Sequence, residues 1–317
     1  MSFVTAYSVA QATDFGPEGI QKKWDAGSPF ELLDMRPGRV ILIGAPPGVG
    51  KTTLSLQLVT NLLERQPELR CVIGNVETAP VVLVEKLLAR YAEVPLDVLQ
   101  DRTMTAEELR QTGEAWKSRG GLLERLAFMD APYSTTHLKK TMTEFQAELV
   151  VLDYAQRFAS RATGDERQKL DALMAEVRTL AGRGACVIAI SSVSRGKSAV
   201  GYENISLSSF RGSAEFEFGA DAAYILEVRP DQSAKLRCVK NRFAEPKDLP
   251  LRFEGQYQRF VAGHLLDSFD AAAKKPKNRP NVRTSERSVP GSLFASFDDD
   301  VPPPETPKKS RTARTPK

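Results

Sequence analysis

A proline- and glycine-rich segment between a strand-like run and a helix-like run has residues that could hold a phosphate chain. The segment is IGAPPGVGKTT at 43–53, and its A-x4-G-K-T spacing fits a phosphate-binding loop with alanine in place of the usual first glycine. Glycines let backbone N–H groups turn toward phosphate oxygens, and the following helix start adds partial positive charge. The nucleotide-binding residues predicted from this segment are Ala45, Pro46, Pro47, Gly48, Val49, Gly50, Lys51, Thr52 and Thr53.

Four side chains have the types that phosphate transfer from ATP to water requires. Lys51 can reach the β- and γ-phosphates, and the Thr52 hydroxyl can ligate Mg²⁺. Asp153 ends the run ELVVLD, where it can hold the same Mg²⁺ through water, although many strands end in aspartate for turn reasons. Glu77 ends CVIGNVE and can orient the attacking water, because the carboxyl ends of parallel strands converge on one crevice. A helix-capping or surface glutamate is the alternative for Glu77. The expected cofactors are ATP and Mg²⁺.

Apolar strand-like runs alternate with helical patterns between residues 36 and 262. The expected strands are 39–44, 71–76, 126–130, 148–153, 186–191, 222–228, 234–240 and 249–254, and the clearest helices are 51–66 and 165–184. Continuously apolar strands separated by helices predict an α/β fold with a mainly parallel sheet and helices on both faces. The last three strands have no helices between them, which predicts an antiparallel extension at one edge of the sheet.

The chain divides into three parts by composition. Residues 1–35 are too short for a domain and are expected to be an extension or linker. Residues 36–266, which include the phosphate-loop segment, are expected to form one nucleotide-hydrolysing domain, and residues 267–317 a basic, proline-rich tail that is predicted to be disordered. Of the 44 cationic and 40 acidic side chains, 33 and 35 fall in residues 1–270, so nucleic-acid affinity of the body must come from local loops. The tail segment SLFASFDDDVPPP at 292–304 is either a docking motif for a protein partner or a solvated linker.

The sequence also indicates where in the cell the protein is located. No run approaches the ~20 apolar residues of a membrane span, and the N-terminus lacks a basic flank followed by an apolar core. We expect no membrane association and a cytoplasmic location. The three cysteines, Cys71, Cys186 and Cys238, are far apart in apolar contexts and are predicted to be buried thiols.

The ordered series of motifs resembles the RecA-type motor domain of the DnaB family of replicative helicases. Over about residues 30–262, the series is GAPPGVGKTT, NVETAP, FMDAPYS, VVLDYAQ, AISSVSR, FRGSAEFEFGADAAYIL, KNRF and LRFEGQYQRF. The resemblance implies a RecA-like fold and a hexameric ring that hydrolyses ATP, moves on single-stranded DNA and unwinds duplex DNA. It implies that Glu77 is the catalytic glutamate and Asp153 the magnesium-associated aspartate. It also implies that Lys240 and Arg242 contact the nucleotide of a neighbouring subunit, whereas a local salt bridge is the alternative for this pair.

The chain departs from the family pattern at three places. Ser192 stands where the family usually has a glutamine that senses the γ-phosphate, no counterpart of the family's N-terminal helical domain is recognised, and the tail has no counterpart. The resemblance implies that the loops after the strands at 148–153 and 186–191 face the DNA. A groove that follows the nucleic-acid backbone needs cations, and ordinary solvated loop charge is the alternative for each of them. Their candidate DNA contacts are Arg157, Arg161, Arg195, Lys197 and Arg211. Glu77 and Arg242 favour an ATP-hydrolysing, DNA-dependent motor. Ser192 and the lack of a recognised N-terminal helical domain favour the alternative, a non-translocating switch or loader that recruits a partner through its tail.

Overall fold

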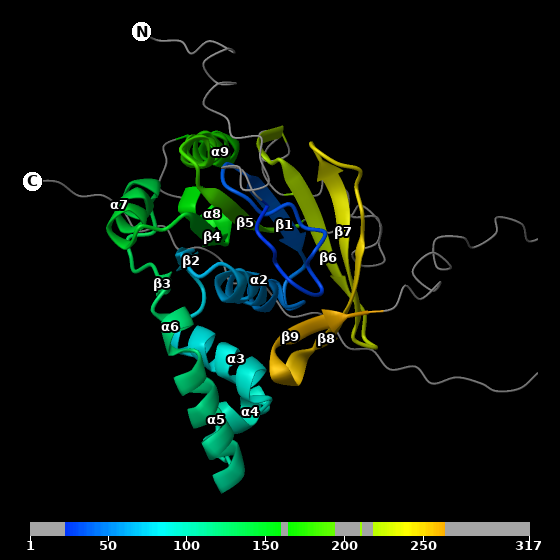
Figure 1. Ribbon diagram of the computed structural model, residues 1–317. Coiled ribbons are helices and arrows are strands. Elements are labelled where there is room, and N and C mark those ends of the chain that lie inside the picture. Colours follow the sequence, from blue (N-terminus) through cyan, green and yellow to red (C-terminus); the bar gives the residue numbers. More distant parts are fainter. Residues whose placement is uncertain (1–22, 160–163, 194–209, 211–217, 264–317) are drawn as a thin grey trace, which may run out of the picture. The chain divides into compact units, whose positions relative to one another are not determined.

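The computed structural model describes residues 23–159, 164–193, 210 and 218–263 of the 317-residue chain. These residues form a sheet of nine strands in the order β3-β2-β4-β5-β1-β6-β7-β8-β9, with helices packed on it (Figure 1). The strands are β1 (Val40–Ala45), β2 (Cys71–Asn75), β3 (Leu126–Phe128), β4 (Leu149–Asp153), β5 (Cys186–Ser192), β6 (Ala222–Val228), β7 (Ser233–Asn241), β8 (Leu249–Glu254) and β9 (Arg259–Ala262). The helices are α2 (Lys51–Arg65), α3 (Pro80–Ala92), α4 (Leu96–Gln100), α5 (Ala106–Ser118), α6 (Gly120–Leu123), α7 (Thr135–Phe145), α8 (Ala155–Ala159), α9 (Glu166–Gly182) and the short 3-10 helix η2 (Gly255–Tyr257).

The pairing of the strands confirms the predicted α/β class. The strands from β3 to β6 are parallel, and β7, β8 and β9 continue the sheet in antiparallel pairs. Two details differ from the sequence prediction. Strand β6, expected in the antiparallel extension, pairs in parallel with β1, with Ile41 opposite Ala222, and is antiparallel only to β7. Strand β9 was not predicted, because four residues are too few to show a period.

Both faces of the sheet are covered by helices. Every residue of β1 is buried, as expected of a central parallel strand. Because side chains alternate along a strand, Ile41 and Ile43 pack into one core with α2 and α3, whereas Val40 and Leu42 pack into a second core with α7 and α9. Figure 1 shows α2 and α9 on opposite sides of the sheet.

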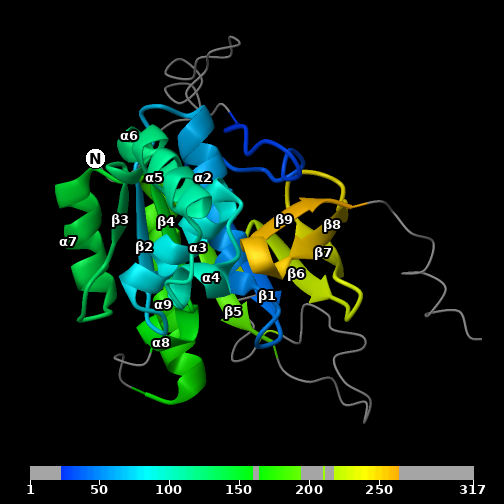
Figure 2. The same cartoon turned by 90° about the horizontal axis from the view of Figure 1, so that it is seen from below.

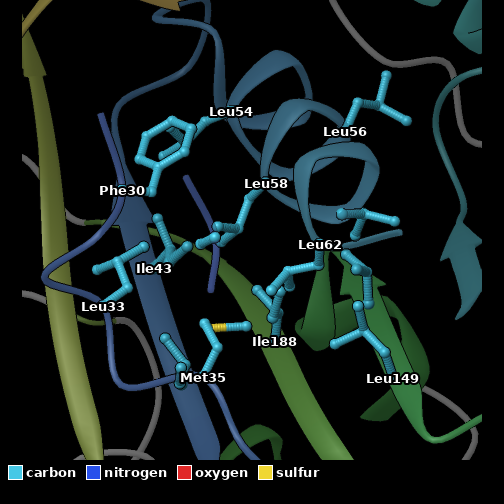
Figure 3. Close-up of a cluster of buried hydrophobic side chains, with 14 of the residues drawn as sticks. Phe30, Leu33, Met35, Ile43, Leu54, Leu56, Leu58, Leu62, Leu149 and Ile188 are labelled. Carbon is cyan, nitrogen blue, oxygen red and sulfur yellow. The ribbon is translucent and has the colours of Figure 1, made fainter. Parts of the chain in front are cut away.

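The segment before β1 belongs to the first of these cores. Figure 3 shows Phe30, Leu33 and Met35 beside Ile43 of β1 and Leu58 of α2, and all five side chains are buried. Burial of each large apolar side chain contributes about 1.5–3 kcal/mol. Residues of the extension expected at 1–35 therefore help to close the domain, and the boundary of the domain stays a prediction.

Two expectations from composition concern the thiols and the membrane. Cys71, Cys186 and Cys238 are buried free thiols, as predicted. Burial raises the pKa of the Cys71 thiol well above its ordinary value, so this thiol is protonated near neutral pH. Within the described ranges, no helix combines the length and the apolar character that crossing a bilayer requires.

Candidate active site

The loop between β1 and α2 has the backbone geometry of a phosphate cradle. Gly48 and Gly50 have φ angles of 80° and 89°, a left-handed conformation that glycine adopts without strain. Gly50 is the N-cap of α2, and Lys51 is its first residue. The Lys51 ammonium donates a hydrogen bond to the Pro46 carbonyl at 3.1 Å, across the loop. This hydrogen bond holds the Lys51 ammonium near the N-terminus of α2, where backbone N–H groups would face a bound phosphate.

The predicted metal ligands Thr52 and Asp153 meet where helix α2 begins and strand β4 ends. The Thr52 hydroxyl donates to Asp153 Oδ2 at 2.6 Å, so helix α2 and strand β4 bring the two side chains into contact. Burial raises the pKa of Asp153, and the nearby Glu77 charge raises it further, whereas the Thr52 hydrogen bond and the Lys51 charge lower it. A hydroxyl beside a buried carboxylate fits Mg²⁺, which prefers oxygen ligands.

Asn75 holds this arrangement together, and the sequence pattern did not reveal it. It ends β2 directly beside Asp153 in the sheet, and its Nδ2 donates to Asp153 Oδ2 at 2.9 Å. Its Oδ1 accepts hydrogen bonds from the backbone N–H groups of Glu77 at 3.0 Å and Thr78 at 2.7 Å. One buried amide therefore fixes both the aspartate and the turn that carries the glutamate. A single asparagine at the end of an apolar run carries no signal that distinguishes this role from a turn.

A cavity of about 340 Å³ joins the loop to Glu77. Its lining is Gly48, Gly50, Lys51, Thr52, Thr53, Glu77, Thr78, Lys86, Phe253, Gly255 and Gln258. The size lies at the lower end of ordinary ligand pockets. The structure thus brings Lys51, Thr52 and Glu77 to one cavity with Asp153 behind Thr52, while their catalytic roles stay predictions.

Two lining residues, Lys86 and Gln258, were not among the predicted site residues; Lys86 lies in no motif, whereas Gln258 lies in the motif LRFEGQYQRF. Lys86 lies on α3, and its ammonium donates to Gln258 Oε1 at 2.6 Å; the same oxygen accepts from the Thr53 hydroxyl at 2.8 Å. Burial lowers the pKa of Lys86 because its charge loses hydration. The hydrogen bond of this half-buried cation is to a neutral amide, so an anion in the cavity would find a second lysine besides Lys51.

Replacing Lys86 with methionine should weaken ATP binding about tenfold or more, because one charge-assisted hydrogen bond is lost. The apolar stem is retained, so the fold should be unaffected. Titration of a fluorescent ATP analogue measures the effect. The control is Lys140→Met, an exposed lysine of α7 that pairs with Glu144. If the Lys86→Met protein and the parent bind the ATP analogue with equal affinity, Lys86 does not contact the nucleotide.

Ser192, the predicted γ-phosphate sensor, lies beside the loop. It ends β5 and pairs with Ala45, the last residue of β1. The preceding Ser191 is buried, and its hydroxyl accepts a hydrogen bond from Gln156 Nε2 at 2.6 Å. Gln156 Oε1 is buried and has no hydrogen-bond partner within the part of the chain that the structure describes. The position next to the loop suits a sensor, and the sensing role stays a prediction.

Of the five residues predicted to contact DNA, the structure describes only Arg157. Arg161, Arg195, Lys197 and Arg211 lie outside the described residues, as does the tail segment 292–304. Arg157 is exposed on α8, and its Nε donates to the Tyr154 hydroxyl at 2.9 Å.

Lys240 and Arg242 lie at the far end of the sheet from the loop. Both donate to the Phe218 carbonyl, at 3.2 Å and 2.9 Å, so they point to the same side of β7. Arg242 Nη1 also contacts the buried carboxylate of Asp221 at 2.9 Å. Asp221 in turn accepts from the backbone N–H of Val40, which begins β1. Because β1 rises about 3.3 Å per residue, Arg242 is separated from the phosphate loop of its own chain by roughly 17 Å of strand.

Asp221 is shared by two arginines. Arg178 of α9 contacts its second oxygen at 2.7 Å, so this buried carboxylate keeps a cationic partner even when Arg242 is engaged elsewhere. The local salt bridge that the sequence left open for Arg242 is present. It does not decide whether Arg242 also contacts a neighbouring molecule, and that role stays a prediction.

Comparison with known proteins decides the family. The family model of the DnaB-like helicase C terminal domain matches residues 32–262. The chain belongs to this family. The match confirms the resemblance that the ordered motifs indicated, and it covers every element from the segment before β1 to β9.

Relatives of this DnaB-like domain are longer than the chain. Replicative DNA helicase DnaB of Leifsonia xyli subsp. xyli is 24% identical over an alignment of 249 positions that covers 72% of this chain and 52% of that protein. A probable plasmid replicative DNA helicase of Chlamydia trachomatis serovar L2 is 23% identical over an alignment of 234 positions that covers 71% of this chain and 51% of that protein. The chain spans about half the length of these curated relatives.

Solved structures confirm the RecA-like fold of this DnaB-like domain. A structure described as an ATPase domain superposes with a TM-score of 0.67 at 19% identity, over 81% of this chain and 96% of that chain. A DnaB-like replicative helicase, described with its interactions with primase, gives 0.68 at 18% identity, over 82% and 67%. The KaiC-like protein PH0186 of Pyrococcus horikoshii OT3 gives 0.51 at 16% identity, over 76% and 98%.

Proposed function

We propose that this domain is an ATP-hydrolysing motor that moves on single-stranded DNA, a DnaB-like helicase of replication or recombination. The observation that carries the proposal is the cavity shared by Lys51, Thr52 and Glu77, with Asp153 in contact with Thr52. Lys51 would bind the phosphates, and Thr52 and Asp153 would hold Mg²⁺, whose charge neutralises the developing phosphate charge. Glu77 would orient and deprotonate the attacking water.

We further propose that the active assembly is a ring, with six subunits as in the family. The position of Arg242 supports an oligomer, because a strand length separates it from the loop of its own chain. An arginine at that distance can contribute to hydrolysis only at the nucleotide of another molecule. Its planar guanidinium suits that task, since it can bridge two phosphate oxygens.

The alternative function is a non-translocating switch or loader that binds ATP and recruits a partner. Ser192 favours it, because a serine hydroxyl beside the loop reaches less far than the glutamine that the family usually has there. Such a protein would assemble with ATP, yet DNA would leave its rate of hydrolysis unchanged.

The ATPase rate with and without a single-stranded oligonucleotide separates the two functions. For the motor we expect the rate to rise with the oligonucleotide and the mass, measured by light scattering with ATP, to be that of a ring. Duplex DNA of the same sequence is the matched control. A rate unaffected by single strands, in a protein that still assembles with ATP, would contradict the motor and support the switch.

A further inference from the structure

A second cavity, of about 390 Å³, lies away from the phosphate loop and shares no lining residue with the first. It lies between α2, α3, β9 and the segment at Ser28–Pro29. Figure 2 shows these helices and β9 beside one another. Three of its lining residues are arginines, namely Arg90 of α3, Arg119 at the junction of α5 and α6, and Arg259 of β9. Glu64 of α2 is the acidic residue in the lining.

Arg90 is a half-buried charge held by neutral groups. Its Nη1 donates to the Thr60 hydroxyl at 2.6 Å, and its Nη2 donates to Asn61 Oδ1. Among the described residues, no carboxylate lies within ion-pair distance of this guanidinium. Burial lowers the pKa of Arg90; the charges of Tyr91 and Glu64 raise it, and the charges of Arg119 and Arg259 lower it. A cation in this position is stabilised by an anion, because partial burial removes much of its hydration.

Two more donors in the cavity make no hydrogen bond of good geometry. The Tyr91 hydroxyl and Arg119 Nε are buried, and neither makes a hydrogen bond of good geometry in the described part of the chain, although the Tyr91 hydroxyl lies near Thr60 and the Glu64 carboxylate. Arg119 Nε is 3.3 Å from Glu64 Oε1, an ion pair without the direction of a hydrogen bond. The guanidinium groups of Arg90 and Arg119 lie 5.0 Å and 4.7 Å from the Tyr91 ring centre, so the three side chains form one cluster.

The charge of Arg259, the third arginine of the cavity, is already balanced by two carboxylates. Its Nη1 contacts Glu93 at 2.5 Å, and its Nε contacts Glu254 at 2.6 Å. The unsatisfied part of the cavity is therefore the side formed by Arg90, Tyr91 and Arg119. Buried polar groups without partners are uncommon in native proteins and call for a ligand or ordered water.

We propose that this cavity binds a compact phosphate-bearing anion, whose oxygens accept hydrogen bonds from Arg90, Arg119 and the Tyr91 hydroxyl. The guanidinium fork matches the spacing of phosphate oxygens. An anion there neutralises Arg90 and displaces Glu64 from Arg119. A small phosphate compound and a nucleic-acid backbone offer the same chemistry. The site shares no lining residue with the cavity at the phosphate loop.

Calorimetric titration with pyrophosphate tests the proposal in the Lys51→Ala background, which weakens phosphate binding at the loop. We expect saturable binding that Arg119→Gln weakens about tenfold or more, because a charge-assisted contact is lost. Glu64→Gln should strengthen binding several-fold, since it removes the competing carboxylate. A purely structural cluster would not give opposite effects for these two substitutions.

The matched control is Arg110→Gln, an exposed arginine of α5 that pairs with Glu107 and Glu114. It should leave the affinity for pyrophosphate unchanged. If Arg119→Gln does not fold, Tyr91→Phe and Glu64→Gln provide the same comparison, with weaker and tighter binding expected. No saturable binding, or an affinity that none of these substitutions alters, would overturn the proposal. If a single-stranded oligonucleotide competes with pyrophosphate, the natural ligand of the cavity is a nucleic-acid backbone. If the oligonucleotide does not compete, the natural ligand is a small phosphate compound.

Discussion

Lys51→Ala should abolish nucleotide binding, whereas Glu77→Gln should keep binding and stop turnover. Lysine compensates phosphate charge in the ground state, so its loss removes affinity itself. Glu77 acts on the water, and a glutamine of the same size cannot accept a proton. Loss of a general base typically lowers the rate about 10²–10⁴-fold. Binding of a fluorescent ATP analogue and release of phosphate measure the two effects separately.

Two controls make this comparison specific to the site. Glu107→Gln alters an exposed carboxylate on α5 that pairs with Arg110, and it should change neither affinity nor rate. Thermal unfolding of the Glu77→Gln protein should match that of the parent, because the turn is held by backbone N–H bonds to Asn75 rather than by the carboxylate. Hydrolysis by Glu77→Gln at the parent rate would show that another residue activates the water.

The part of the site that the sequence predicted is the part built from strand ends. The phosphate loop, Glu77 and Asp153 each follow an apolar run, and parallel strands bring their carboxyl ends to one edge whatever the details of packing. The same reasoning predicted the α/β fold, because runs such as those of β1 and β5 are apolar at almost every position.

Residues that reach the site from elsewhere were not predictable. Lys86 lies on an amphipathic helix, where a lysine is ordinarily a solvated side chain, and its role depends on how α3 packs over the loop. Gln258 lies in the motif LRFEGQYQRF, directly before β9, but the motif gives no sign that this glutamine side chain faces the phosphate loop. The burial of Phe30 and Leu33 was missed for a similar reason, since an irregular segment has no period that reveals its packing.

The arginine cavity shows the same limit for binding sites. Arg90, Arg119 and Arg259 lie on three separate elements, and each in isolation has the appearance of ordinary surface charge. Their convergence with Tyr91 results from the contact of α2 with both α3 and β9. No spacing along the chain encodes it, so only the packed structure brings this group of donors together.

Mixing an Arg242→Ala protein with a Lys51→Ala protein should restore ATPase activity that neither has alone. Arg242 is 44% exposed and lies a strand length from the loop of its own chain, so it is available to a neighbour. An arginine finger can contribute about 10³–10⁵ in rate. In mixed rings, some boundaries pair an intact Lys51 with an intact Arg242. Phosphate release across a series of mixing ratios should therefore pass through a maximum.

Loss of activity in the Arg242→Ala protein could also result from loss of the salt bridge between Arg242 and Asp221, and the same experiment tests this structural explanation. Arg242→Ala leaves the buried carboxylate with Arg178 as its cationic partner among the described residues, so some loss of stability is expected. Arg178→Gln removes the other arginine and should cost similar stability while leaving ATPase activity in assembled rings intact. If the two variants lose activity equally, the effect comes from Asp221 and the fold. The mixed proteins could co-assemble without recovering ATPase activity, and the Arg242→Ala protein alone could keep the full DNA-stimulated ATPase rate. These two results together would show that Arg242 is a local ion-pair partner and does not act as an arginine finger. Recovery in the mixture, with Arg178→Gln active, requires that one molecule's arginine acts on another molecule's ATP.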